Sequence, residues 1–125
     1  MRAPLAGLAI VLLGVPALAE PPVREDYTLH CSGCHGADAA GTAGVAPTLH
    51  DLGSLLDRDG GRDYLARVPG VAQAPLSDAR LARLLNWVLS EFSGAAPVPA
   101  YSADEVGRLR EQPLRDAPAA RPRAG

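Results

Sequence analysis

The chain has no lysine and is poor in the side chains that usually build or hold a protein core. Its 125 residues include one phenylalanine, one tryptophan and only two cysteines, so that one disulfide is the most it could form. Its 12 arginines and 14 acidic residues make no clustered basic patch of the kind that binds nucleic acid. A core this thin is usually marginal unless a disulfide, a metal or another staple supports it.

Long apolar runs are absent beyond the first twenty residues, "MRAPLAGLAIVLLGVPALAE". That segment has a basic residue, Arg2, then an apolar run over 5–18, and it closes with Ala-Leu-Ala. The pattern predicts a secretory signal peptide, residues 1–19, that is cleaved after Ala19. A retained membrane anchor is the less favoured alternative, because the run is shorter than the ~20 residues of a spanning helix and Pro16 interrupts its end. We therefore expect no stable membrane span after cleavage.

Export has two consequences for the rest of the chain. Residues 20–125 carry eleven arginines against fourteen acidic side chains, a formal net charge of −3. The two cysteines would enter an oxidising compartment, where thiols seldom stay free.

The apolar pattern predicts an all-α protein. Between Ser77 and Gly94, six apolar residues fall at offsets of 0, 3, 4, 7, 8 and 11, the period of an α-helix. Ser77 suits the start of this helix and Gly94 its end. A strand is excluded here because the alternation of apolar and polar residues never holds for four positions. The six residues are Leu81, Leu84, Leu85, Val88, Leu89 and Phe92.

Shorter elements are predicted before this helix. A helix is expected at Val23–His30, and short helices are expected near 49–57 and 61–67. Residues 36–47, "GADAAGTAGVAP", are too rich in glycine and alanine for a packed helix and are expected to form a loop. Prolines then break the helical pattern within "VPGVAQAP", residues 68–75.

Composition divides the chain into three parts. The signal peptide is followed by residues 20–93, which carry the helical patterns and are expected to form the folded domain. Residues 94–125 are a tail rich in proline, alanine and arginine. Within the tail, "SADE" at 102–105 has the spacing of a capping box and predicts one short helix, up to about Gln112. Beyond it we expect disorder, because a segment without apolar residues cannot offset its ordering entropy.

The segment "CSGCH" concentrates the reactive side chains of the protein. Cys31, Cys34 and His35 have the C-x-x-C-H spacing of covalent c-type haem attachment. Two thiols three residues apart on a helical turn can each add to one vinyl group of the same porphyrin. The adjacent histidine can then coordinate the iron. A covalently held haem would also supply the large apolar body that the core lacks.

Three other uses of these residues are less favoured. A structural zinc site needs four ligands, and adding His50 to the three residues of the motif would make four, but no second ligand pair is present. A redox dithiol is typical of a thioredoxin-like βαβ context, and the sequence predicts no strands. A disulfide across two residues would be strained and weak.

The sequence resembles the class I c-type cytochromes from about Val23 to Phe92. The segment "CSGCHGADAAG" is similar to their haem-binding segment, and Tyr27 stands where that family often has an aromatic residue on its first helix. "GVAPTLHDL" resembles the family segment whose proline packs beside the proximal histidine and whose carbonyl orients its ring. That role would fall on Pro47.

The resemblance extends to "PLSDARLARLLNWVLSEF", which is similar to the C-terminal helix that crosses the first helix near the haem edge. It implies a small cytochrome c-like domain of about four helices around a covalently bound haem c. Cys31 and Cys34 would bind this cofactor, and His35 would be the proximal iron ligand. The tail after Gly94 lies outside the resemblance.

The chain departs from the family at the second axial ligand. The family usually supplies a methionine from the loop before the last helix, but the only methionine here is Met1, and Val68–Pro69 stands where Met-Pro is expected. The sixth iron position is therefore open or water-filled, or another side chain takes it. His50 is the alternative ligand, although its place after the proline segment favours a surface histidine. His30, Gln73, Asn86 and Trp87 are weaker candidates for contact with the iron or the haem edge.

The sequence thus predicts an exported, periplasmic monohaem cytochrome that carries single electrons and is not an enzyme. Its expected partners are redox proteins, such as a periplasmic dehydrogenase or a terminal oxidase. A vacant sixth position would instead favour a gas sensor or a haem enzyme. A third alternative is a haem subunit docked on a dehydrogenase, with the tail as a tether.

Overall fold

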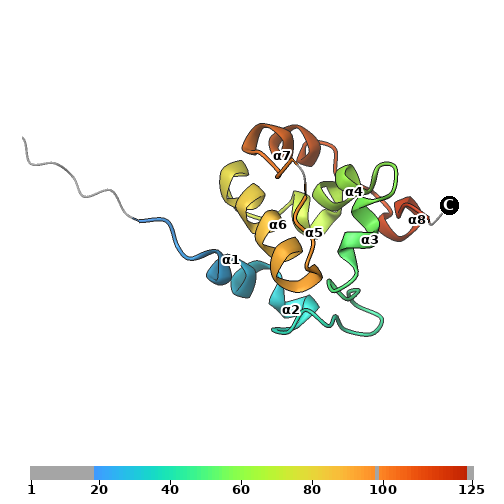
Figure 1. The fold of residues 1–125 in the computed structure, drawn as a ribbon, viewed down its shortest axis with the longest axis horizontal. Helices are drawn as coiled ribbons and strands as arrows, with labels where there is room; N and C mark the ends of the chain where they lie inside the picture. Colours follow the sequence, from blue (N-terminus) through green and yellow to red (C-terminus); the bar gives the residue numbers. More distant parts are fainter. Residues whose placement is uncertain (1–18, 98, 124–125) are drawn as a thin grey trace, which may run out of the picture.

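The computed structural model describes residues 19–97 and 99–123. The described residues form eight helices and no β-strand beyond one isolated bridge between Thr42 and Ala46, which confirms an all-α protein (Figure 1). The predicted signal peptide, except for Ala19, lies outside the described residues. The helices are α1 (Val23–His30), α2 (Ser32–His35), α3 (Leu52–Leu56), α4 (Gly61–Arg67), α5 (Pro69–Ala72), α6 (Asp78–Ser93), α7 (Ala103–Arg110) and α8 (Ala117–Ala120).

There are more helices than the four or so expected, because several are single turns. α2, α5 and α8 have four residues each. α5 follows α4 after one residue, Val68, whose extended backbone (ψ 138°) is the conformation favoured before a proline. Among the described residues, no helix is both long and apolar enough to cross a membrane.

Helix α6 forms the centre of the core, as the apolar periodicity predicts. Leu81 and Leu89 are 1% exposed. The Ser77 side chain accepts a hydrogen bond from the backbone N–H of Arg80, and Gly94 ends the helix in the left-handed conformation. Both ends of the helix therefore have the caps that the sequence indicates.

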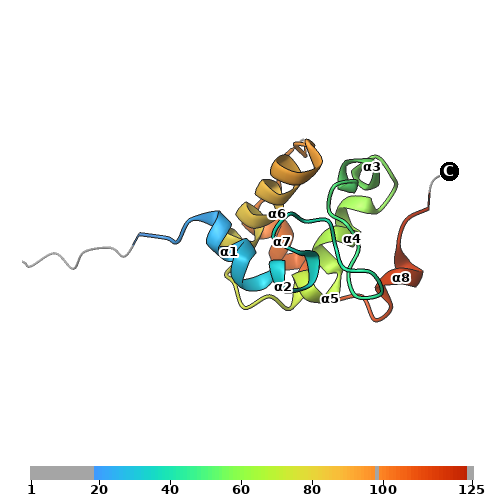
Figure 2. The same ribbon diagram turned by 90° about the horizontal axis from the view of Figure 1, so that it is seen from below.

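Helix α1 crosses α6 and packs on it through aromatic side chains (Figure 2). Tyr27 is 2% exposed, and its ring centroid lies 4.9 Å from that of Phe92 and 5.7 Å from that of Trp87. The guanidinium of Arg24 lies over the Trp87 ring, 5.3 Å from its centroid. Three of the few aromatic residues thus gather where α1 meets α6.

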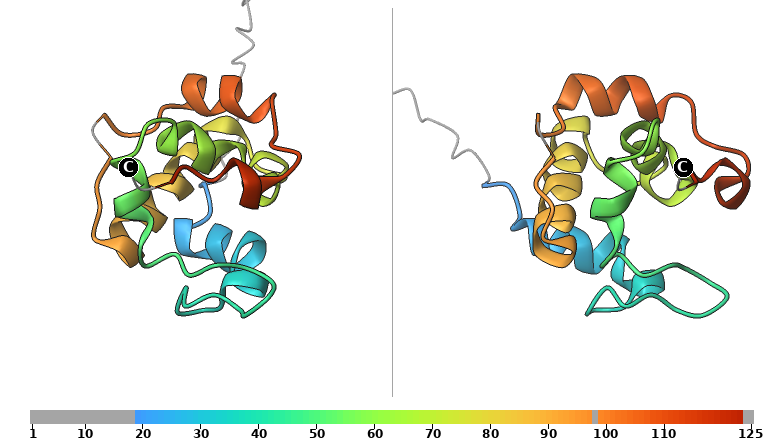
Figure 3. Two further views of the ribbon diagram at one scale, coloured as in Figure 1. Left: turned by 90° about the vertical axis from the view of Figure 1, so that its right-hand side faces the viewer. Right: turned by 45° about the vertical axis from the view of Figure 1, so that its right-hand side comes forward.

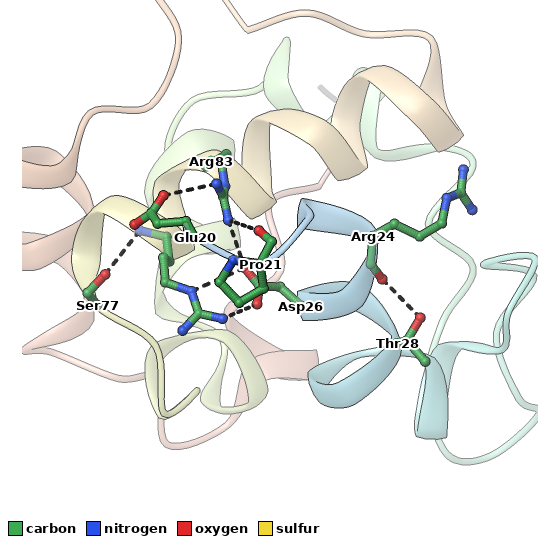
Figure 4. Close-up of polar contacts among 8 residues, drawn as sticks. Glu20, Pro21, Arg24, Asp26, Thr28, Ser77 and Arg83 are labelled. Atoms are coloured by element: carbon green, nitrogen blue, oxygen red, sulfur yellow. Dashed lines mark hydrogen bonds and ion pairs between the residues drawn. The ribbon is translucent and has the colours of Figure 1, made fainter. Parts of the chain in front are cut away.

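A buried ion cluster fixes the same helix pair (Figure 4). The Asp26 carboxylate is fully buried and accepts hydrogen bonds from Arg80 and Arg83 of α6. Arg83 also donates to the Glu20 carboxylate and to the Pro21 carbonyl, at 2.9 and 2.8 Å. Burial alone raises the pKa of Asp26, but the hydrogen bonds and charges of the two arginines outweigh it and hold this pKa below its usual value.

The C-terminal region packs onto the core, which corrects the expectation of an appended tail. Tyr101 is 4% exposed and Val106 is fully buried, both within the main hydrophobic cluster. α7 lies across α6 and alongside α4 (Figure 3). The Ser102 hydroxyl accepts a hydrogen bond from the backbone N–H of Glu105, which confirms the predicted start of this helix. Isolated apolar residues in a Pro-rich stretch gave no periodic signal of this packing.

The expected disorder beyond Gln112 is also corrected. The backbone N–H of Leu114 donates to the carbonyl of Arg67 at 2.8 Å, and Arg58 donates to the carbonyl of Pro122 at 2.8 Å. The Asp116 side chain caps α8. These contacts hold the segment against α4 and the turn that precedes it, even though few of its own side chains are apolar.

Candidate functional site: the C-x-x-C-H segment

The cysteine-containing segment is a helix that stops and restarts. Cys31 ends α1, where its N–H still bonds to the carbonyl of Tyr27, and its bent backbone (φ −126°) begins α2. The N–H groups of Cys34 and His35 then bond to the carbonyl of Cys31 at 3.2 and 3.0 Å. The single turn of α2, together with Cys31 that precedes it, therefore carries both thiols and the histidine of the motif within five residues.

The two thiols have different environments. Cys31 packs against the hydrophobic core and is half-buried, whereas Cys34 is exposed, and the two do not form a disulfide. Burial, and next the negative charge of Asp26, raise the pKa of the Cys31 thiol to about 11. Cys31 is therefore a protonated thiol at neutral pH.

His35 is held by a hydrogen bond from its Nδ1 to the carbonyl oxygen of Pro47, at 2.9 Å. A carbonyl oxygen can only accept, so Nδ1 carries the proton. The other ring nitrogen, Nε2, then has its lone pair free to coordinate a metal. The contact between His35 and Pro47 is the one that the family resemblance implied.

The loop of residues 36–48 brings Pro47 back to His35. The N–H of Gly41 donates to the carbonyl of His35 at 2.8 Å, and the Thr42 hydroxyl donates to the carbonyl of Cys34 at 2.8 Å. Gly41 has a φ of +84°, and a Cβ atom there would lie 2.6 Å from the carbonyl carbon of Pro47. Glycine is thus required for the backbone conformation and for the close approach.

Gly41 was not singled out by sequence reasoning, which predicted only a loop over this region. Its signal is weak, because the loop holds three glycines and nothing in their spacing marks one of them. Tyr27, which the family resemblance singled out as an aromatic residue of the first helix, donates through its hydroxyl to the carbonyl of Gly36 at 2.6 Å and secures the turn that follows α2.

The structure places His50 beside the loop that holds His35. Its exposed ring bonds through Nε2 to the carbonyl of Asp38 at 2.9 Å, and it lies edge-on to Phe92 with ring centroids 6.4 Å apart. By the same argument as for His35, this Nε2 carries the proton, and the lone pair of the ring is on Nδ1. In the part of the chain that the structure describes, no three His, Cys, Asp or Glu side chains gather as a metal site.

Two of the remaining candidates for contact with the iron or the haem edge are engaged in other contacts. Trp87 packs with Tyr27 and Phe92, and Asn86 exchanges two hydrogen bonds with the backbone of Tyr101. Gln73 is exposed just after α5, and His30 is half-buried at the end of α1.

The motif and its geometry are the basis for assigning a function. No protein-family model matches the sequence, and no curated protein matches it significantly.

Proposed function

We propose that this protein is an exported monohaem c-type cytochrome that carries single electrons between redox proteins of the periplasm. The observation that carries the proposal is the 2.9 Å hydrogen bond from His35 Nδ1 to the Pro47 carbonyl, next to two free thiols in C-x-x-C-H spacing. A histidine that ligates a metal through one ring nitrogen typically donates the N–H of the other to a backbone carbonyl or a carboxylate, and His35 makes such a bond.

The donor set fits a covalently attached haem. Each thiol, at Cys31 and Cys34, would add its S–H across one vinyl group, forming a thioether with no atom lost. Cys31 lies against the core and Cys34 lies at the surface. The haem edge that carries the two thioether bonds would therefore run from the core to the surface. When bound, the haem supplies an iron that takes one electron from a donor protein and gives it to an acceptor protein.

The other residues of the site orient and support this group. Pro47 fixes the tautomer and the ring plane of His35 and increases its basicity as a ligand. Gly41 lets the loop approach closely enough for this contact. No bond-making step is assigned to any side chain of the site, and the protein is proposed to be an electron carrier rather than an enzyme.

A gas sensor or haem enzyme is the second candidate. The observation in its favour is the hydrogen bond between His50 Nε2 and the Asp38 carbonyl, which ties the His50 ring to the loop of residues 36–48, the same loop that holds His35. The third alternative, a subunit tethered to a dehydrogenase by its tail, loses its tether, because residues 99–114 pack against the domain.

The test is covalent haem in protein expressed in a host with a cytochrome c maturation system. Denaturing electrophoresis followed by a haem-peroxidase stain should give a band at the size of the mature chain. Cys31→Ser and Cys34→Ser should each weaken or remove the band. Ser32→Ala is the matched control, since the Ser32 hydroxyl donates only to the Thr28 carbonyl, and its band should remain. An unstained wild-type protein would refute the proposal.

A further inference from the structure

Residues 99–114, here called the C-terminal strap, make a series of polar contacts with α4 and with the segment that leads from α4 to α6. At its start, Arg62 donates to the Pro99 carbonyl at 2.8 Å and forms a two-pronged ion pair with Glu105, at 2.5 and 2.7 Å. The Tyr101 hydroxyl donates back to the carbonyl of Arg62 at 2.7 Å. At its end, Arg67 donates to the Gln112 carbonyl at 2.8 Å.

Arg110 of the strap holds the turn that follows α5. Its guanidinium donates to three alternate backbone carbonyls, at 2.9, 2.5 and 2.8 Å, and to the Asp78 carboxylate at 3.0 Å. The side chain is 17% exposed. The three carbonyls belong to Ala72, Ala74 and Leu76.

This arrangement depends on the shape of an arginine. A planar guanidinium has donors directed to several sides at once, whereas a lysine ammonium is a single point of charge. The side chains of Ala74 and Leu76 are buried in the hydrophobic core, but the segment supplies few polar contacts of its own. Between Val68 and Ser77 the only polar side chain is that of Gln73, which is exposed. Arg110 is therefore the main polar tie on this turn.

The turn held by Arg110 lies on the side of α2 away from the loop that holds His35. α5 is above α2 in Figure 1 and beside it in Figure 2, whereas residues 36–48 extend below α2 in Figure 1. The right-hand view of Figure 3 shows the same order. Pro47 holds His35 from the loop, so a haem bound through the other ring nitrogen of His35 would lie on the side of α2 where α5 is.

We propose that the C-terminal strap, through Arg110, keeps residues 72–76 closed over the iron face opposite His35 and limits the access of small molecules to it. The inference rests on the proposed function, since it needs a haem bound at Cys31 and Cys34. Arg110 is a positioning residue in it: it touches only the chain and acts through the turn that it holds.

The test compares haem-loaded wild type with Arg110→Ala, Arg110→Lys and the control Arg108→Ala. Arg108 lies on the same helix and is exposed. Two quantities are measured: the rate of carbon monoxide association with the ferrous protein, and hydrogen exchange at the amides of residues 73–76. Arg110→Ala should increase both by about fivefold or more, the factor that one net hydrogen bond contributes to an opening equilibrium. Both quantities for Arg110→Lys should lie between those of wild type and Arg110→Ala. Arg108→Ala should give the same association rate and hydrogen exchange as wild type.

The outcomes separate this inference from the proposed function. Haem-loaded Arg110→Ala with an unchanged association rate would overturn the inference, whether or not hydrogen exchange had changed, and would leave the cytochrome intact. Wild type without covalent haem would overturn both. If Arg110→Ala did not fold, Arg110→Lys would serve as the test, because it keeps the positive charge but removes the planar guanidinium. A carbon monoxide association rate equal to that of wild type in Arg110→Lys would then refute the role of Arg110.

Discussion

A Cβ atom at Gly41 would lie 2.6 Å from the carbonyl carbon of Pro47, the residue whose oxygen accepts the hydrogen bond from His35. Real Cβ atoms do not approach backbone atoms this closely, so any side chain at position 41 must push the two segments apart. The loop would then lose the position from which it fixes the His35 ring. A glycine in an unremarkable loop thereby controls the geometry of the proposed iron ligand.

Gly41→Ala should therefore destabilise the protein more than Gly44→Ala. Both glycines have positive φ, +84° and +73°, so both substitutions place alanine in the left-handed conformation at a cost of about 1–2 kcal/mol. A Cβ at Gly44 meets nothing within 4 Å, whereas one at Gly41 also meets the Ala46 oxygen and the Thr48 nitrogen at 2.7 Å. The clash should add about 1–3 kcal/mol to the loss for Gly41→Ala alone.

Denaturant unfolding of the two glycine variants, followed by far-UV circular dichroism, measures this difference. The haem stain serves as a second measurement, since misplacing His35 should not prevent attachment through the cysteines. Equal unfolding free energies for the two variants would show that the loop shifts freely, and would remove the proposed role of Gly41.

Asp26→Asn should destabilise the contact between α1 and α6. The substitution leaves Arg80 and Arg83 without the buried carboxylate that both contact. Breaking a fully buried pair costs about 3–5 kcal/mol, and we expect about 2–3 kcal/mol here because the two arginine side chains are 27% and 36% exposed. Urea unfolding at pH 7 measures the loss, with exposed Asp51→Asn as the control for a removed surface charge.

The loss from Asp26→Asn should also depend on pH. The pKa of Asp26 lies below its ordinary value of 3.8, so the unfolded chain binds the proton first as the pH falls. The stabilisation is then fully present above pH 4 or so and is lost as the pH falls through the lower, folded-state pKa. The difference between wild type and Asp26→Asn should accordingly shrink in strong acid. A difference that stayed constant from pH 7 to pH 2 would contradict a charged Asp26 in the folded state.

Features that depend on neighbouring residues could be predicted from the sequence, whereas contacts between residues far apart in the chain could not. Local signals were sufficient for α6, with its apolar period and its caps at Ser77 and Gly94, and for the start of α7 at Ser102. Contacts between distant residues gave no local signal. Asp26 has the sequence neighbourhood of a surface charge, yet its partners lie 54 and 57 residues away.

The C-terminal strap and the site illustrate the same limit. Tyr101 and Val106 stand alone in a Pro-rich stretch, so only the surface that α4 and α6 offer shows that they are buried. For the candidate site, motif spacing identified Cys31, Cys34 and His35, and the family resemblance implied the contact with Pro47. The steric requirement for Gly41 could not be predicted, because it exists only once the loop has closed.

The last prediction concerns the sixth position of the iron. The described residues contain no methionine, so the oxidised protein should lack the thioether-to-iron band near the red end of the visible spectrum.

We expect an open or water-filled sixth position. The reduced protein should then be high-spin and should bind carbon monoxide, at a rate that the C-terminal strap limits. His50→Ala should leave both properties unchanged, because the hydrogen bond from Nε2 to the Asp38 carbonyl holds the His50 ring on the loop that also carries Pro47. The contrary result would be a low-spin ferrous spectrum that becomes high-spin in His50→Ala. It would mean that His50 leaves Asp38 when haem is bound, and bis-histidine ligation would then give a lower reduction potential than a methionine–histidine pair.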